Sequence, residues 1–207
     1  MSMTLVQAYV DTLRDTVLQA AVTGASGRTI PLEQAVVLTG KEMRAAHQRG
    51  NRVFFVGNGG SAAIASHMAT DYSKNGGIRS CALNDASMLT CLGNDYGYEH
   101  VFEKQIEWHM RAGDVLVAIS SSGGSRNILN AVKATRAHGC TVYTLSGFKP
   151  DNPLRSLGDI NFYLQSSEYG FVEVGHLMLL HNVLDLQIGW RPAEAIEVAS
   201  LSKVAGG

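Results

Sequence analysis

The chain has 207 residues, 45% of them hydrophobic, and a formal net charge of −1 at pH 7. This length suits one domain with a full core, and the balanced charge excludes a disordered chain or a general nucleic-acid-binding surface. No apolar run approaches a membrane span, and the first residues lack the basic and apolar regions of a signal peptide. Cys81, Cys91 and Cys140 lack metal-ligand spacing and are predicted to be buried free thiols. We expect a soluble, cytoplasmic protein that binds neither membrane nor nucleic acid.

Two helices are predicted before the first strand. Apolar residues recur at helical spacing from Leu5 to Val22, and the glycines at 24 and 27 interrupt this pattern. A second helix is predicted from Pro31 to about Gly50. These helices have no sheet of their own to cover, so the sequence leaves open whether they pack on the domain or on another subunit.

A glycine-rich corner follows the first predicted strand. The apolar run 53–56 is typical of a buried parallel strand, and it ends in Gly57-Asn-Gly-Gly-Ser61. A helix over 62–72 is predicted next, with Ser61 as its N-cap. Free backbone N–H groups and the helix dipole make such a corner a ready anion site. For this corner alone, a plain tight turn is an equal alternative.

A second corner of similar design follows later in the chain. Residues 114–119 form a strand-like run, Ser120-Ser-Ser-Gly-Gly-Ser125 comes next, and a helix is predicted from Arg126 to His138. Hydroxyl groups at the end of a buried strand suit the oxygens of a phosphate monoester. The segment has neither a Walker A ending nor the Gly-x-Gly-x-x-Gly fingerprint. The pair of corners therefore predicts phosphate binding without a nucleotide.

The remaining segments complete an alternation of strands and helices. Between the corners the predicted elements are a strand (78–83), a short helix capped by Asn84 or Asp85, a loop (93–98) and a helix (102–110). After the second corner they are strands (140–146 and 160–164) and a long helix (171–188). The alternation predicts an α/β fold with a doubly wound, five-stranded parallel sheet flanked by helices. Ligands of such sheets bind at the carboxyl ends of the strands.

Two pairs of polar residues on the predicted helices are candidates for a functional site. His67 and Asp71 are four residues apart and therefore share one helix face. Glu173 and His181 are eight apart, about 80° around the helix axis, and also point in similar directions. His176 and His181 are about 140° apart and do not converge on one small site. Taken alone, each histidine favours a structural role over a functional one, and His181 lies among leucines, as a core histidine would.

Five motifs together resemble the SIS (sugar isomerase) family, and within it the phosphoheptose isomerases, over about residues 35–190. The motifs are Gly57-Asn-Gly-Gly-Ser61, Gly93-Asn-Asp-Tyr-Gly97, Ile119-Ser-Ser-Ser-Gly-Gly-Ser125, Leu145-Ser-Gly147 and Glu173-x-x-His176-x-x-x-x-His181. The resemblance implies interconversion of sedoheptulose 7-phosphate and D-glycero-D-manno-heptose 7-phosphate through an enediol, for surface polysaccharide synthesis. It also implies a homotetramer with active sites between subunits. The predicted parts are an N-terminal helical extension for oligomerisation (1–50), an SIS sugar-phosphate-binding domain (51–190) and a C-terminal tail (191–207).

The same resemblance assigns roles to individual residues. It implies Asp71 and His181 as the catalytic acid and base. The implied substrate-binding residues are Asn58, Gly59, Ser61, Asn94, Asp95, Ser120, Ser121, Ser122, Ser125 and Glu173. The implied metal ligands are His67, Asp71, Glu173 and His181, for one zinc ion per subunit.

The chain departs from the family at several of these positions. Asp71 stands where the family has glutamate, Glu173 stands where it has glutamine, and Gly170–Val172 lack the family's arginine and aspartate. Asp71 is one methylene shorter than glutamate, which matters because proton transfer needs close contact. Without a cation the carboxylates of Asp71 and Glu173 would repel each other, which favours a bound metal.

Two alternatives stay open from the sequence. Some SIS proteins are non-catalytic and bind a protein partner, including one similar to this chain that binds the bacterial replication initiator. That relative lacks the catalytic histidine, whereas His181 is present here. The altered residues also leave room for an isomerase that acts on another sugar phosphate.

Overall fold

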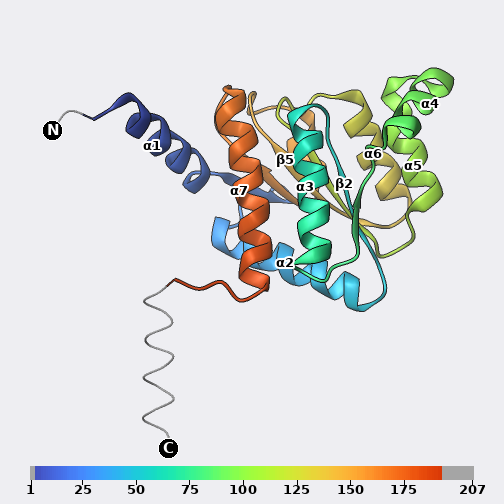
Figure 1. Ribbon diagram of the computed structural model, residues 1–207, viewed down its shortest axis with the longest axis horizontal. Helices are drawn as coiled ribbons and strands as arrows, with labels where there is room; N and C mark the ends of the chain where they lie inside the picture. The colour runs from blue at the N-terminus through green and yellow to red at the C-terminus, as the bar shows by residue number, and fades with distance from the viewer. Residues whose placement is uncertain (1–2, 193–207) are drawn as a thin grey trace, which may run out of the picture.

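A six-stranded sheet with helices on both faces forms the body of the computed structural model, which describes residues 3–192 (Figure 1). The strand order is β1-β6-β5-β4-β2-β3. The strands are β1 (Ala21–Gly24), β2 (Val53–Val56), β3 (Ser80–Ala82), β4 (Val115–Ser120), β5 (Thr141–Ser146) and β6 (Ile160–Tyr163). The helices are α1 (Leu5–Leu18), α2 (Leu32–Gln48), α3 (Gly60–Lys74), α4 (Ala86–Tyr96), α5 (Val101–His109), α6 (Arg126–Ala137) and α7 (Tyr169–Gln187), with short 3-10 turns η1 (Tyr98–His100) and η2 (Pro153–Ser156). Within the described range, no helix has the length and apolar character needed to cross a bilayer.

The five predicted strands are confirmed as the parallel strands β2 to β6. The prediction of a five-stranded sheet is nevertheless wrong by one edge strand. β1 pairs antiparallel with β6, from Ala21 opposite Tyr163 to Gly24 opposite Ile160. The first helix ends at Leu18 and not at Val22, because Val22 and Thr23 are β-branched and join the sheet. The N-terminal segment is therefore built into the sheet and is not purely helical.

Alternating side chains on the strands divide the core into two layers. On β2, Val53 and Phe55 pack with residues of α2, α3 and α7. Phe54 and Val56 point to the other face and pack with residues of α4, α5 and α6. This alternation follows from the pleat of a strand that is covered on both sides. It places α3 and α7 next to each other on one face of the sheet (Figure 1).

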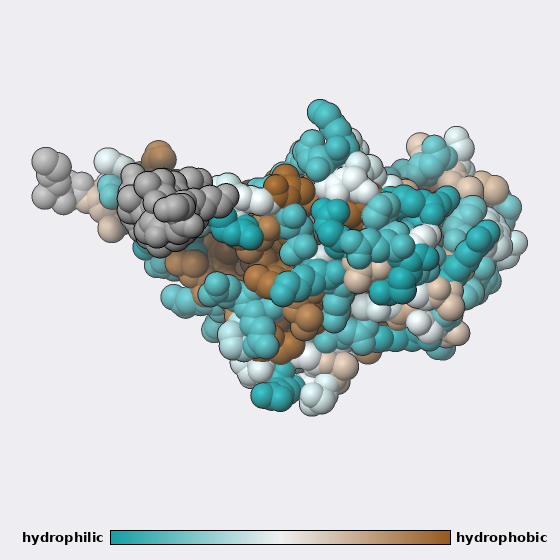
Figure 2. Space-filling view, turned by 90° about the horizontal axis from the view of Figure 1, so that it is seen from below, coloured by the Kyte–Doolittle hydropathy of each residue, from teal (hydrophilic) through white to brown (hydrophobic). Residues whose placement is uncertain are grey.

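The two predicted N-terminal helices pack in different ways. α2 lies against α7 and belongs to the core layer of that face. α1 extends away from the body and contacts α7, where the rings of Tyr9 and Phe171 have centroids 4.6 Å apart (Figure 1). Leu5 and Val6 of α1 are 91% and 74% exposed. Figure 2 shows further apolar side chains gathered on the face seen from below, where α2 lies.

Three local predictions need correction. Ser61 is not the N-cap of α3: Gly59 occupies that position, and Ser61 is buried in the first turn. The predicted loop 93–98 is mostly helical, because α4 continues to Tyr96. Cys91 is exposed and Cys81 is only partly buried, so the buried-thiol prediction holds for Cys140 alone. The predicted cap at Asp85 is confirmed, since its carboxylate accepts a hydrogen bond from the backbone N–H of Met88 at 2.9 Å.

Candidate functional site

The two glycine- and serine-rich corners meet in one hollow. β2 and β4 are hydrogen-bonded neighbours, so the segments that follow them emerge at the same edge of the sheet. The hollow has a volume of about 230 Å³. Its lining includes eight of the predicted substrate-binding residues, namely Asn58, Gly59, Ser61, Ser120, Ser121, Ser122, Ser125 and Glu173, together with Gly60 and Tyr169. Tyr169 was not predicted from the sequence, because it belongs to none of the five motifs.

Glycines make the first corner possible. A Cβ atom at Gly57 would lie 2.5 Å from the carbonyl carbon and oxygen of Ser61, so the helix start packs directly on the strand end. Gly59, the N-cap of α3, has φ +53°, a backbone conformation that side chains disfavour. The N–H groups of Ala62 and Ala63 bond to the carbonyl of Gly59, so in the first turn of α3 it is Gly60 and Ser61 that can offer N–H groups to the hollow.

Two helix N-termini favour an anion in the hollow, although the carboxylate of Glu173 also belongs to its lining. α3 begins at Gly60 and α6 begins at Arg126, directly after Ser125, so two helix N-termini face this space. Each contributes free N–H groups and the positive end of its dipole. No lysine or arginine is among the described residues that line the hollow. An anion held here would be bound by neutral donors and helix dipoles.

Ser121 is an unsatisfied donor in this hollow. Its hydroxyl is buried and has no hydrogen-bond partner within the described part of the chain. A buried hydroxyl without a partner costs about 1–3 kcal/mol. Its backbone is fixed, because the Ser121 carbonyl accepts a hydrogen bond from the N–H of Gly147 at 2.9 Å. The hydroxyl oxygen is enclosed, so a ligand oxygen in the hollow would satisfy it after rotation of the Ser121 side chain.

A side-chain network holds Asn58 at the rim of the hollow. The amides of Asn58 and Asn127 exchange two hydrogen bonds, each of 2.9 Å. The hydroxyl of Tyr98 also donates to Oδ1 of Asn58, at 3.0 Å. Sequence reasoning missed Asn127 and Tyr98, because their partner lies 69 and 40 positions away. The network ties the turn after α4 to the first corner.

A second group of polar residues lies where α3 and α7 run side by side. Nε2 of His67 is 3.2 Å from Nε2 of His181 and 3.4 Å from Oδ2 of Asp71. The donor atoms of these three residues all lie within 4.8 Å of one another. Zinc–ligand distances of about 2.0–2.1 Å place two ligands of a tetrahedral ion about 3.3 Å apart. The spacing and the donor set therefore fit a divalent metal ion.

The structure places the other predicted site residues elsewhere. Glu173 is not part of the His67–Asp71–His181 group: it lines the hollow, and a Cβ atom on Gly60 would collide with its carboxylate. Asn94 and Asp95 lie in the last turn of α4, where Nδ2 of Asn94 donates to Oδ1 of Asp95 at 2.8 Å. Both are exposed and neither lines the hollow.

His176 is a core residue, as its angular position suggested. It is fully buried, and its Nε2 lies 3.1 Å from the carbonyl oxygen of Ser146. Burial lowers the pKa of His176 to about 4, so the ring is neutral near pH 7. It faces β5 and not the cluster that contains His181.

Comparisons with known proteins agree with these features. A family model described as SIS domain matches residues 28–147. The phosphoheptose isomerase of Pelobacter propionicus is 38% identical over 147 residues, which cover 68% of this chain and 77% of that protein. The phosphoheptose isomerase of Aliarcobacter butzleri is 35% identical over 162 residues, covering 75% and 83%. A solved phosphoheptose isomerase from Neisseria gonorrhoeae is 31% identical with a TM-score of 0.76, covering 88% of this chain and 96% of that one.

Proposed function

The chain belongs to the SIS domain family, and we propose that it is a phosphoheptose isomerase. It would interconvert sedoheptulose 7-phosphate and D-glycero-D-manno-heptose 7-phosphate, and thereby supply heptose for surface polysaccharide. One observation carries this proposal: α3 and α7 both border the serine-lined hollow, and both contribute to the His67–Asp71–His181 group. A phosphate site and an acid/base group are therefore joined by the same two helices.

Different residues would bind the phosphate and transfer the proton. The hydroxyls of the second corner and the N-termini of α3 and α6 would hold the phosphate, with Ser121 gaining its missing partner. Asp71 and His181 would move a proton between C1 and C2 of the open-chain sugar, one as base and the other as acid. Positioned acid/base groups of this kind contribute about 10²–10⁴-fold to a rate.

A metal ion is part of the proposal. His67, Asp71 and His181 would hold it, and their spacing supports zinc as the ion. Zinc, when bound, supplies a positive charge that polarises the carbonyl and hydroxyl oxygens of the sugar. Glu173 was predicted both as a metal ligand and as a substrate-binding residue. It lines the hollow, and both roles stay part of the proposal.

We also propose a homotetramer with active sites between subunits. Leu5 and Val6 of α1 are largely exposed, and burial against another subunit would remove this apolar surface from water. Asn94 and Asp95 do not reach the hollow of their own chain, which suits a site completed by a neighbouring subunit. A cytoplasmic location remains part of the proposal, and residues 193–207 of the predicted C-terminal tail lie outside the described residues.

A label-exchange experiment tests the proposed reaction. Zinc-loaded protein is incubated with sedoheptulose 7-phosphate in D₂O, and the products are followed by NMR spectroscopy. We expect the aldose product with deuterium at C2, because the acid/base group exchanges its proton with solvent. Chelator-treated protein should be much slower, and zinc should restore the rate. Shorter sugar phosphates assayed in parallel identify a different substrate, and no label in any sugar would support the non-catalytic alternative.

A further inference from the structure

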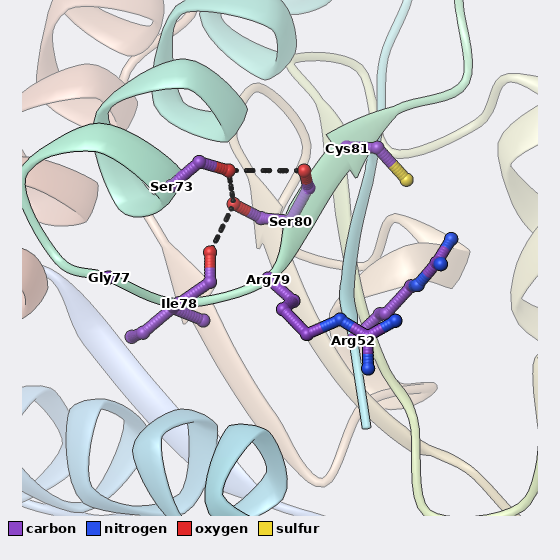
Figure 3. Close-up of a pocket in the computed structure, with 7 residues that line it drawn as sticks. All are labelled: Arg52, Ser73, Gly77, Ile78, Arg79, Ser80 and Cys81. Atoms are coloured by element: carbon purple, nitrogen blue, oxygen red, sulfur yellow. Dashed lines mark hydrogen bonds between the residues drawn. The ribbon is translucent and has the colours of Figure 1, made fainter. Parts of the chain in front are cut away.

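A second pocket lies at the opposite end of the sheet, where β2 and β3 begin (Figure 3). It has a volume of about 380 Å³, and its lining includes Arg52, Arg79, Ser73, Ser80 and Cys81. β2 has four residues, so this pocket is separated from the serine-lined hollow by roughly 13 Å of strand. The proposed isomerase reaction uses none of these residues.

Two arginines stand next to each other in this pocket. Val53 pairs with Ser80 in the parallel ladder, and Arg52 and Arg79 are the residues directly before this pair. The backbone N–H of Val53 donates to the carbonyl of Arg79 at 2.9 Å, which fixes the register at this point. Figure 3 shows the Arg79 guanidinium beside the start of the Arg52 side chain, while the Arg52 guanidinium extends further along the pocket.

Neither guanidinium is neutralised by an acidic side chain. In the range 3–192, no carboxylate lies within 4.0 Å of the guanidinium of Arg52 or Arg79. Nη1 of Arg79 donates to the carbonyl of Gly50 at 2.8 Å, which leaves its other N–H groups available. Asp114 is occupied by backbone donors, since it accepts from the N–H groups of Arg52 at 2.8 Å and Arg111 at 2.7 Å. Two positive side chains thus start from neighbouring backbone positions, and an anion bound between them would offset their repulsion.

The other side chains of the pocket form a neutral, fixed wall. The hydroxyls of Ser73 and Ser80 are 2.8 Å apart (Figure 3). Ser80 also donates to the carbonyl of Ala69 at 2.8 Å. Burial raises the pKa of the Cys81 thiol, so it does not add a negative charge. A neighbouring groove of about 620 Å³ shares Ser73, Ser80 and Cys81 and continues past Lys74 along β3. The pocket is therefore positive, with room beside it for a larger molecule.

We propose that this pocket binds a phosphorylated small molecule, with a phosphate group bridging Arg52 and Arg79. Guanidinium groups match phosphate oxygens in pairs of parallel hydrogen bonds, which are stronger than neutral ones. The pocket volume lies within the usual range for small-molecule sites, and the groove along β3 would take the remainder of the ligand. The site is separate from the serine-lined hollow and does not depend on isomerase activity.

Calorimetry with inorganic pyrophosphate tests this site at constant ionic strength. All proteins carry Ser122→Asp, which places a negative charge in the serine-lined hollow and prevents phosphate from binding there. In this background we expect saturable binding of pyrophosphate. Adding Arg52→Gln and Arg79→Gln should weaken it roughly tenfold or more. The matched control, Arg28→Gln with Lys133→Gln, removes the same charge from exposed positions and should bind normally.

A second double variant is the control for a folding defect. Arg52→Lys with Arg79→Lys keeps the charge but loses the paired geometry, so its affinity should fall between the other two. Circular dichroism and the melting temperature establish that each variant is folded. Absence of binding in the Ser122→Asp background, or equal affinity in the arginine, glutamine and lysine forms, would overturn the proposal.

Discussion

Nε2 of His67 and Nε2 of His181 lie 3.2 Å apart, although the two residues are 114 positions apart in the sequence. His67 lies on α3 and His181 lies on α7. Asp71 belongs to the same helix as His67. Two imidazole nitrogens at this distance share a hydrogen bond in one tautomer or a metal ion between them. The second possibility suits the acidic neighbour, because a carboxylate and neutral imidazoles together are a common zinc-binding set.

Metal binding should stabilise the protein through these residues. After treatment with a chelator, added zinc should raise the melting temperature of the native chain. At a free concentration 100 times the dissociation constant, the gain is about 2.7 kcal/mol. His67→Ala should abolish the rise, which differential scanning calorimetry measures directly.

Glu173→Gln is the matched variant for that experiment. It keeps the shape of the side chain and removes its charge at the rim of the hollow. Because three donor groups are already gathered without Glu173, most of the zinc-dependent rise should remain. An equal rise in His67→Ala and in the native chain would contradict the proposed site.

Loss of His181 should separate catalysis from phosphate binding. His181→Ala is expected to lower kcat for sedoheptulose 7-phosphate by about 10²–10⁴-fold, the usual contribution of an acid/base group. The affinity for inorganic phosphate should hardly change, because His181 does not line the hollow. Steady-state kinetics and calorimetry provide the two readouts. The exposed His109→Ala serves as control and should retain full activity, while unchanged kcat in His181→Ala would remove the assigned role.

Removing the Ser121 hydroxyl should have opposite effects on stability and binding. The group is buried and has no hydrogen-bond partner among residues 3–192, so Ser121→Ala should leave the free energy of unfolding unchanged or raise it by about 1 kcal/mol. The same substitution should raise KM, because the ligand loses a donor. Urea unfolding and kinetics distinguish these effects. Ser122→Ala is the comparison, since Ser122 is exposed and should not stabilise the chain. A clear loss of stability in Ser121→Ala would mean that the hydroxyl already has a partner.

The sequence predicted the strands and corners well because their signals are local. The apolar runs of β2 and β4 end in glycine and serine, and both properties are visible within ten residues. Edge strand β1 was missed because four residues, Ala21–Gly24, continue the apolar pattern of the preceding helix. Their strand conformation depends on pairing with β6, which lies almost 140 positions later.

The site was predictable only in part, because its residues also meet through contacts between segments that are far apart in the sequence. Helical spacing placed His67 beside Asp71, but it contained no information on how α3 meets α7. The contact with His181 therefore came from the family resemblance and not from periodicity. Glu173 shows the limit of angular reasoning: it shares a direction with His181, but two turns of α7 separate them along the axis. It consequently lies at the hollow and outside the three-residue group.

His176 should make stability depend on acidity. Its pKa is about 4 in the folded protein and about 6.5 when unfolded, so the unfolded chain binds the proton more readily. The contribution is constant above about pH 6.5 and is lost as the pH falls towards 4. Between pH 7 and pH 5 the free energy of unfolding should decrease by about 2 kcal/mol from this residue. His176→Gln should remove that part of the decrease in urea titrations, whereas His109→Gln, at an exposed position, should retain it.

The shared architecture of α3 and α7 has a consequence for substrate length. Gly60 and His67 are seven residues apart on α3, and Glu173 and His181 are eight apart on α7, so on each helix about 10.5–12 Å separates the residue at the hollow from the histidine. The two helices thus fix the distance between the phosphate site and the histidines. A sugar anchored by its phosphate reaches the imidazoles only if its carbon backbone is extended and long enough, whatever the stereochemistry of its hydroxyls.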